Sequence, residues 1–138
     1  MRKKVLIIDD EQDVMTYLVA ILESNNCIPY SADSVQRGFQ MLEKVKPDLI
    51  CLDIMMPKES GISMYIRLKQ DQALKNIPIM IISGVEQAGE FNFRSYVPDK
   101  SIPAPVCFME KPIDVEKYIQ TIEKLMSSGT ASEKQEDK

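Results

Sequence analysis

Hydrophobic residues along this chain occur in two patterns that alternate. Short, continuous apolar runs, several of them rich in β-branched residues, predict buried strands. These runs cover Val5–Asp9, Ile28–Ala32, Leu49–Asp53, Ile77–Ser83 and Val106–Met109. After the first run, Val14, Leu18 and Leu22 recur at helical spacing, and similar spacing follows most of the other runs. The chain is therefore predicted to alternate between strand and helix.

This alternation predicts an α/β protein with a flavodoxin-like, doubly wound, five-stranded parallel sheet in the order 2-1-3-4-5. Parallel strands need crossover connections, which are right-handed and place helices on both faces of the sheet. The fourth helix region is expected to be irregular, because Pro98, Pro103 and Pro105 exclude one regular helix there. We expect one domain over residues 1–126. Residues 127–138 (SSGTASEKQEDK) have no apolar period and predict a disordered C-terminal tail.

Composition and charge exclude several classes of function. The net charge of the 138 residues is −4 with both signs mixed, so we expect no direct nucleic-acid partner. No apolar run is long enough for a signal peptide or a membrane span, which predicts a cytoplasmic protein without membrane contact. Cys27, Cys51 and Cys107 are widely spaced and are expected to be reduced, buried thiols. The chain has no histidine, which excludes catalysis by imidazole.

Polar residues that can carry chemistry follow four of the predicted strands. Asp9 and Asp10 end the first strand, Asp53 the third and Ser83 the fourth, while Lys111 follows the fifth. Because the carboxyl ends of parallel strands share one edge of the sheet, these side chains are expected to converge there. Adjacent carboxylates repel each other, so the site needs a positive charge. Lys111 and a bound Mg²⁺ ion would supply it, since carboxylate oxygens suit that metal.

Each of these residues also has an ordinary structural explanation when taken alone. Asp9 and Asp10 could cap the helix that follows them, and Ser83 could cap another. Asp53 could begin a turn, and Lys111 could be a solvated surface residue. The occurrence of all five at one edge favours a functional site.

Four segments, VLIIDDEQD, LICLDIMMPKESG, IPIMIISG and FMEKPID, occur in this order. Together they resemble the response-regulator receiver domains of two-component signalling, over about residues 3–126. The resemblance implies that Asp53 accepts a phosphoryl group from a kinase phosphohistidine. It also implies that Mg²⁺ is held by Asp9, Asp10, Asp53 and the backbone carbonyl of Met55.

The same resemblance implies a phosphoryl-binding pair and a switch. The counterparts of Ser83 and Lys111 contact the phosphoryl oxygens in receiver domains, and Ser83 moves toward them on phosphorylation. Phe108 would then change its burial. A cis peptide bond is expected between Lys111 and Pro112. Gly61 is expected in the loop beside the site because glycine permits a backbone conformation that other residues resist.

The function implied by the resemblance is that of a single-domain response regulator with a switchable partner-binding surface. It would catalyse its own phosphorylation and a slow self-dephosphorylation, without being a conventional enzyme. The implied partners are a sensor histidine kinase or histidine phosphotransfer protein, an unidentified downstream protein and, as an open alternative, a second copy in a homodimer. The alternative function is a pseudo-receiver, an interaction module that phosphorylation does not control. A phosphatase of the haloacid dehalogenase type is disfavoured because it needs an aspartate where Met55 stands.

The segment from Glu86 to Pro105 is expected to determine partner specificity. It contains Phe91, Phe93 and Tyr96, and its prolines prevent a continuous helix that would bury all three rings regularly. Exposed aromatic side chains favour protein contacts. The alternative, that these rings only hold a long loop against the domain, stays open at this point.

Overall fold

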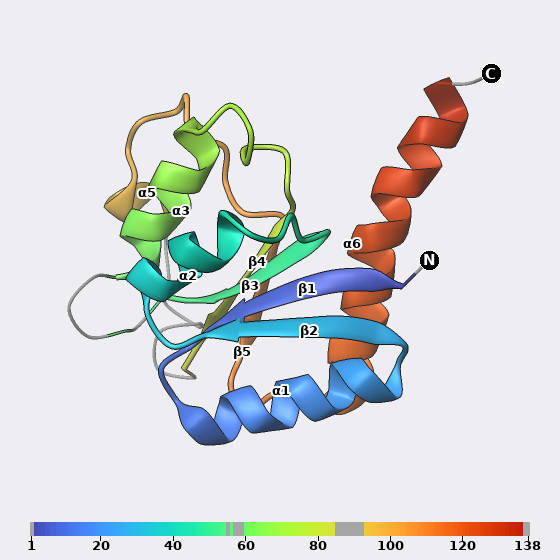
Figure 1. Ribbon diagram of the computed structural model, residues 1–138. Coiled ribbons are helices and arrows are strands. Elements are labelled where there is room, and N and C mark those ends of the chain that lie inside the picture. Colours follow the sequence, from blue (N-terminus) through green and yellow to red (C-terminus); the bar gives the residue numbers. More distant parts are fainter. Residues whose placement is uncertain (1, 55, 57–59, 85–92, 137–138) are drawn as a thin grey trace.

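The computed structural model describes residues 2–54, 56, 60–84 and 93–136. Five parallel strands form one sheet in the order β2-β1-β3-β4-β5, as predicted (Figure 1). The strands are β1 (Lys3–Ile8), β2 (Cys27–Ala32), β3 (Leu49–Asp53), β4 (Ile79–Ser83) and β5 (Cys107–Glu110). All neighbouring strands pair in parallel register. The strand order reverses between β1 and β3, so the carboxyl ends of these strands frame a crevice.

Helices cover both faces of this sheet (Figure 1). They are α1 (Gln12–Ser24), α2 (Val35–Leu42), α3 (Gly61–Gln70), α5 (Phe93–Tyr96) and α6 (Val115–Glu136). One apolar core lies between the sheet and α2 and α3, and the other lies between the sheet and α1 and α6. Among the described residues, no helix combines the length and apolar character that crossing a membrane requires.

Continuous apolar runs became central strands because both of their faces are covered. Val5, Leu6, Ile7 and Ile8 are all fully buried, with successive side chains entering opposite cores.

Local capping then fixes where helices begin. The Ser34 hydroxyl accepts a hydrogen bond from the backbone N–H of Arg37 at 3.1 Å, at the start of α2.

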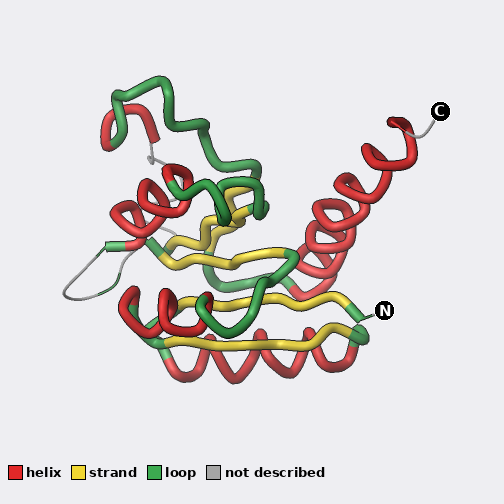
Figure 2. Tube along the Cα trace, turned by 45° about the horizontal axis from the view of Figure 1, so that its top comes forward, coloured by secondary structure: helices red, strands yellow, loops and turns green. Residues whose placement is uncertain are grey.

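The C-terminal segment differs from the prediction. Helix α6 continues to Glu136, whereas a disordered tail was predicted from residue 127 (Figure 2). Loss of the apolar period removes the packing face of a helix, but it does not remove helix propensity. Ala131, Lys134 and Gln135 are strong helix formers and can extend a helix that packing has already nucleated.

The segment before β5 is irregular, as expected, and the burial of Phe93 agrees with the alternative in which the aromatic rings hold this segment against the domain. Phe93 is buried and meets the Tyr65 ring of α3 edge-to-face, with ring centroids 5.3 Å apart. The Tyr65 hydroxyl also donates a hydrogen bond of 2.6 Å to the carbonyl oxygen of Pro103. These contacts hold Phe93 and Pro103 against α3. Phe91 and the side chain of Tyr96 lie outside the described residues.

The three cysteines are free thiols. Cys27 and Cys51 are buried, as predicted, whereas Cys107 is only partly buried. Burial raises the pKa of Cys51 to about 12, although a contact of 3.3 Å with the Tyr118 hydroxyl opposes the rise. Cys51 is accordingly a protonated thiol at neutral pH and a fully buried member of the core next to α1 and α6.

Candidate functional site

The carboxyl edge of the sheet brings the predicted polar residues together. Asp53 is the last residue of β3 and Ser83 the last of β4, and each is almost completely buried. The pairing of β4 with β5 places Ser83 opposite Glu110. The next backbone N–H, that of Lys111, donates a hydrogen bond of 2.7 Å to the Ser83 carbonyl oxygen. Sheet register therefore delivers Lys111 to the same edge as the two buried residues.

The Lys111 ammonium lies among carboxylates. Its Nζ atom is 3.0 Å from Asp9 Oδ2 and 3.4 Å from Asp53 Oδ2, and it also forms an ion pair with Glu11. Burial alone would lower the pKa of Lys111, but the carboxylates of Glu11, Asp9 and Asp53 outweigh it and raise that pKa above its ordinary value. The lysine therefore stays charged at neutral pH, and it provides the cation that the adjacent aspartates require.

Three carboxylates form a cluster that fits a divalent cation. Asp9, Asp10 and Asp53 each offer one oxygen, and these oxygens lie within 4.8 Å of one another. The buried Asp9 carboxylate is held in place, because Lys111 Nζ lies 3.0 Å from its Oδ2 atom and the backbone N–H of Glu11 donates a hydrogen bond of 2.9 Å to its Oδ1 atom. Asp10 is exposed, which leaves the cluster open to solvent. An all-oxygen site that keeps access to water suits Mg²⁺.

The remaining predicted site residues have the following places. The Ser83 hydroxyl donates a hydrogen bond of 3.1 Å to the carbonyl oxygen of Gly84. Phe108, on β5, is 45% exposed. The peptide bond between Lys111 and Pro112 is cis, as predicted. Met55, expected to contribute its carbonyl oxygen to the metal site, lies outside the described residues.

Gly61 supports the site for a different reason from the one predicted. No described glycine has a positive φ angle, so an unusual backbone conformation is not what requires glycine here. A Cβ atom at residue 61 would instead lie 2.2 Å from the carbonyl oxygen of Asp53 and 2.7 Å from the Cα atom of Ile54. The first turn of α3 thus packs directly against the backbone that carries Asp53.

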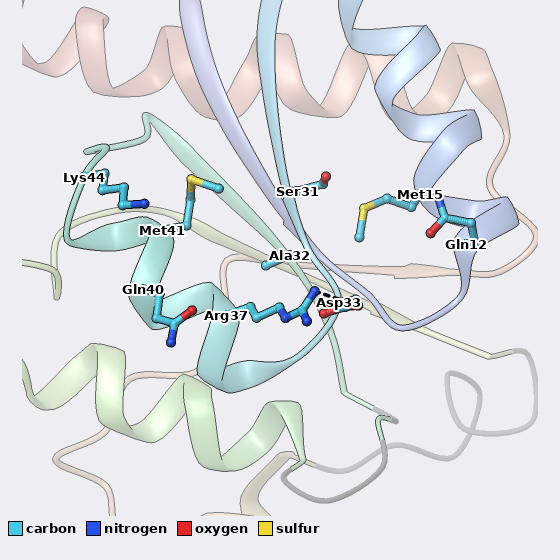
Figure 3. A pocket seen from close by; sticks show the side chains of 9 residues that line it. All are labelled: Gln12, Met15, Ser31, Ala32, Asp33, Arg37, Gln40, Met41 and Lys44. Atoms are coloured by element: carbon cyan, nitrogen blue, oxygen red, sulfur yellow. Dashed lines mark hydrogen bonds and ion pairs between the residues drawn. The ribbon is translucent and has the colours of Figure 1, made fainter.

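A separate hollow lies beside this site, at the end of β2 and between α1 and α2 (Figure 3). Its volume is about 310 Å³. Met15 and Met41 line it, and at its rim Arg37 forms an exposed ion pair with Asp33 at 3.5 Å. None of the predicted metal or phosphoryl ligands is among the lining residues that the structure describes, so the hollow is distinct from the carboxylate cluster.

Comparison with known proteins accounts for this arrangement. A family model of the response regulator receiver domain matches residues 5–123. The chain belongs to the response-regulator receiver family. Phosphorylation and Mg²⁺ binding at acidic residues are general features of receiver domains.

Curated relatives resemble this chain in sequence, some over their whole length and others over only part of it. The polar-differentiation response regulator DivK of Brucella ovis is 27% identical over 134 residues, which cover 94% of this chain and 100% of DivK. The alkaline phosphatase synthesis transcriptional regulatory protein PhoP of Bacillus subtilis is 33% identical over 87 residues, or 63% of this chain. That match covers 35% of PhoP, so the receiver spans only about a third of this relative.

Solved structures support the fold. The crystal structure of a CheY-like response regulator receiver domain protein from Methanospirillum hungatei superimposes with a TM-score of 0.80 at 16% sequence identity. The match covers 96% of this receiver and 99% of that chain. At this identity the likeness concerns the fold alone.

Proposed function

We propose that this receiver accepts a phosphoryl group from a protein phosphohistidine onto Asp53, with Mg²⁺ bound at Asp9, Asp10 and Asp53. The observation that carries the proposal is the buried Asp53 carboxylate, which faces the Lys111 ammonium at 3.4 Å and lies within a carboxylate cluster of metal-binding dimensions. An ion-paired lysine alone would suffice for a structural role. The open cluster of oxygen ligands beside it supports phosphoryl chemistry.

The reaction follows from the residues present. An oxygen of the ionised Asp53 carboxylate attacks phosphorus, the O–P bond forms, and the N–P bond of the phosphohistidine breaks with its electron pair returning to the imidazole. No general base is needed because the carboxylate is already ionised at neutral pH. Bound Mg²⁺ would neutralise charge on the phosphoryl oxygens. Lys111 would contribute its ammonium to the same task, and catalysis would consist of positioning and charge stabilisation.

Switching is proposed to begin at Ser83. Its hydroxyl, now directed to the carbonyl oxygen of Gly84, would turn to a phosphoryl oxygen on Asp53. Ser83 and Phe108 lie on neighbouring strands, and Phe108 is 45% exposed in the present structure. We propose that Phe108 becomes buried when Ser83 moves, which would alter the surface around β5. A ligand can bias the two states because the hydroxyl contacts it in only one of them.

The proposed phosphoryl donor is a sensor histidine kinase or a histidine phosphotransfer protein, in a cytoplasmic setting. The downstream partner would be a protein that distinguishes the two surfaces around Phe108. A pseudo-receiver remains the second candidate. Its specific support is that Lys111 and its carboxylate partners already neutralise one another in part, so the cluster is stable as a purely structural feature.

Phosphoramidate separates the two candidates because it presents the same N–P linkage as phosphohistidine. Incubation of the receiver with phosphoramidate and Mg²⁺ should add one phosphoryl group, detected by intact mass. Chelation of the metal should slow the reaction on the order of 100-fold, because the phosphoryl oxygens would lose most of their charge stabilisation. Equal labelling with and without chelator would contradict the metal assignment, and no labelling at any Mg²⁺ concentration would favour the pseudo-receiver.

A further inference from the structure

Glu11 contacts the site although the sequence patterns did not single it out. Its Oε1 atom forms an ion pair with Lys111 Nζ, across 100 residues of sequence. The two side chains differ in accessibility: that of Glu11 is 58% exposed, whereas that of Lys111 is 14% exposed. Glu11 therefore reaches the buried ammonium from the solvent side of the crevice.

The Glu11 side chain does not serve the helix that it precedes. Glu11 occupies the N-cap position of α1, where a polar side chain commonly accepts a hydrogen bond from the first turn. It makes no such bond. Its own backbone N–H donates to Asp9 Oδ1 at 2.9 Å, which fixes the start of the helix through the backbone. The Glu11 carboxylate is consequently available to Lys111, and its neutralisation leaves the helix start in place.

The ammonium of Lys111 has three N–H donors, and carboxylates of Asp9, Asp53 and Glu11 surround it. A phosphoryl oxygen on Asp53 can contact Lys111 only by taking the place of one of them. Asp9 and Asp53 are buried, and both belong to the carboxylate cluster. Glu11 is the exposed member and has the longer side chain, so it can be displaced into water at the least cost.

We propose that Glu11 is a positioning residue that holds Lys111 in the unphosphorylated receiver and competes with the phosphoryl group for it. This inference rests on the proposed function, because it assumes that Lys111 receives the phosphoryl oxygens. Glu11 thereby occupies the phosphoryl position on the ammonium and weakens binding of the phosphoryl group. Its displacement is part of phosphorylation.

The test uses beryllofluoride with saturating Mg²⁺, since the fluoride atoms of this anion stand in for phosphoryl oxygens on the acceptor carboxylate. The Glu11→Gln variant should bind beryllofluoride about fivefold more tightly than the wild type, which is the size of a partly screened ion pair. Its affinity for Mg²⁺ alone should change much less. Fluorine NMR titrations and calorimetry measure the two affinities. Structural damage would weaken anion binding, so damage cannot account for a gain.

The matched control is Asp13→Asn, which removes the same charge from an exposed position in the first turn of α1. Asp13 makes no ion pair with Lys111 in the described structure. A gain in Glu11→Gln that exceeds that in Asp13→Asn supports the competition. Equal effects of the two variants would overturn it in favour of general charge repulsion, with the proposed function intact. Failure of the wild type to bind beryllofluoride would overturn the proposed function and this inference with it.

Discussion

The Gly61→Ala variant is expected to lose about 3 kcal/mol of unfolding free energy and most of its capacity for phosphorylation. The added Cβ atom would lie 2.2 Å from the Asp53 carbonyl oxygen and 2.9 Å from the Asp53 carbonyl carbon. Backbone atoms at the end of a central strand cannot rotate away, so α3 or the Asp53 backbone has to shift. Overpacking of this kind costs about 1–3 kcal/mol, and contact with backbone places this case at the upper end. Chemical denaturation and intact mass after phosphorylation measure the two effects.

Gly38 offers a matched control, because it is a buried glycine of α2 that faces side chains and not backbone. A Cβ atom there would meet Met64 Cε at 2.9 Å and Ile8 Cδ1 at 3.0 Å. Both are ends of side chains that can move, and alanine gains about 1 kcal/mol of helix propensity over glycine. Gly38→Ala should therefore stay within about 1 kcal/mol of the wild type and be phosphorylated normally. Equal destabilisation by the two substitutions would show that contact with the Asp53 backbone is not what makes Gly61 special.

The Lys111→Ala variant should be destabilised by about 3 kcal/mol in the absence of Mg²⁺, since buried Asp9 and Asp53 would lose their cation. Phosphorylation should slow on the order of 100-fold, which is typical for removal of a charge-stabilising donor. Mg²⁺ should restore part of the stability, because a metal that binds only the folded state stabilises it. Denaturation with and without Mg²⁺ measures this recovery.

The pH range of this lysine's effect follows from the direction of its pKa shift. The folded-state pKa of Lys111 is raised, so its stabilising contribution is fully present below the unfolded pKa of about 10.4 and is lost only above that. The difference between wild type and Lys111→Ala should consequently not change between pH 7 and 9. Lys117→Ala, at an exposed position of α6, serves as the control and should leave stability and phosphorylation near wild type. A control variant as damaged as Lys111→Ala would contradict the assigned role.

The sequence sufficed for the sheet and for the convergence of Asp9, Asp53 and Lys111. Continuous apolar runs are strong signals for strands covered on both faces, and parallel strands necessarily present their carboxyl ends at one edge. The residues that terminate those runs could therefore be placed together without knowledge of any contact.

What the sequence did not reveal depends on contacts between distant segments. The role of Gly61 comes from the approach of α3 to the Asp53 backbone, and the burial of Phe93 comes from its contact with Tyr65. The ion pair between Glu11 and Lys111 joins the first strand's end to the last strand's end. A glutamate at a helix start has common capping and solvent-exposed roles, so its residue type alone carries no signal for this pair. The extent of α6 was missed because propensity continues after the apolar period stops.

The role of Asp53 as phosphoryl acceptor is tested most directly by intact mass after incubation with acetyl phosphate and Mg²⁺, for wild type and Asp53→Asn, with Asp13→Asn as the control. We expect the wild type and Asp13→Asn each to gain one phosphoryl group and Asp53→Asn to gain none, because an amide lacks the ionised oxygen that attacks phosphorus. Labelling of Asp53→Asn as fast and as complete as that of the wild type would contradict the assignment of Asp53 as the acceptor.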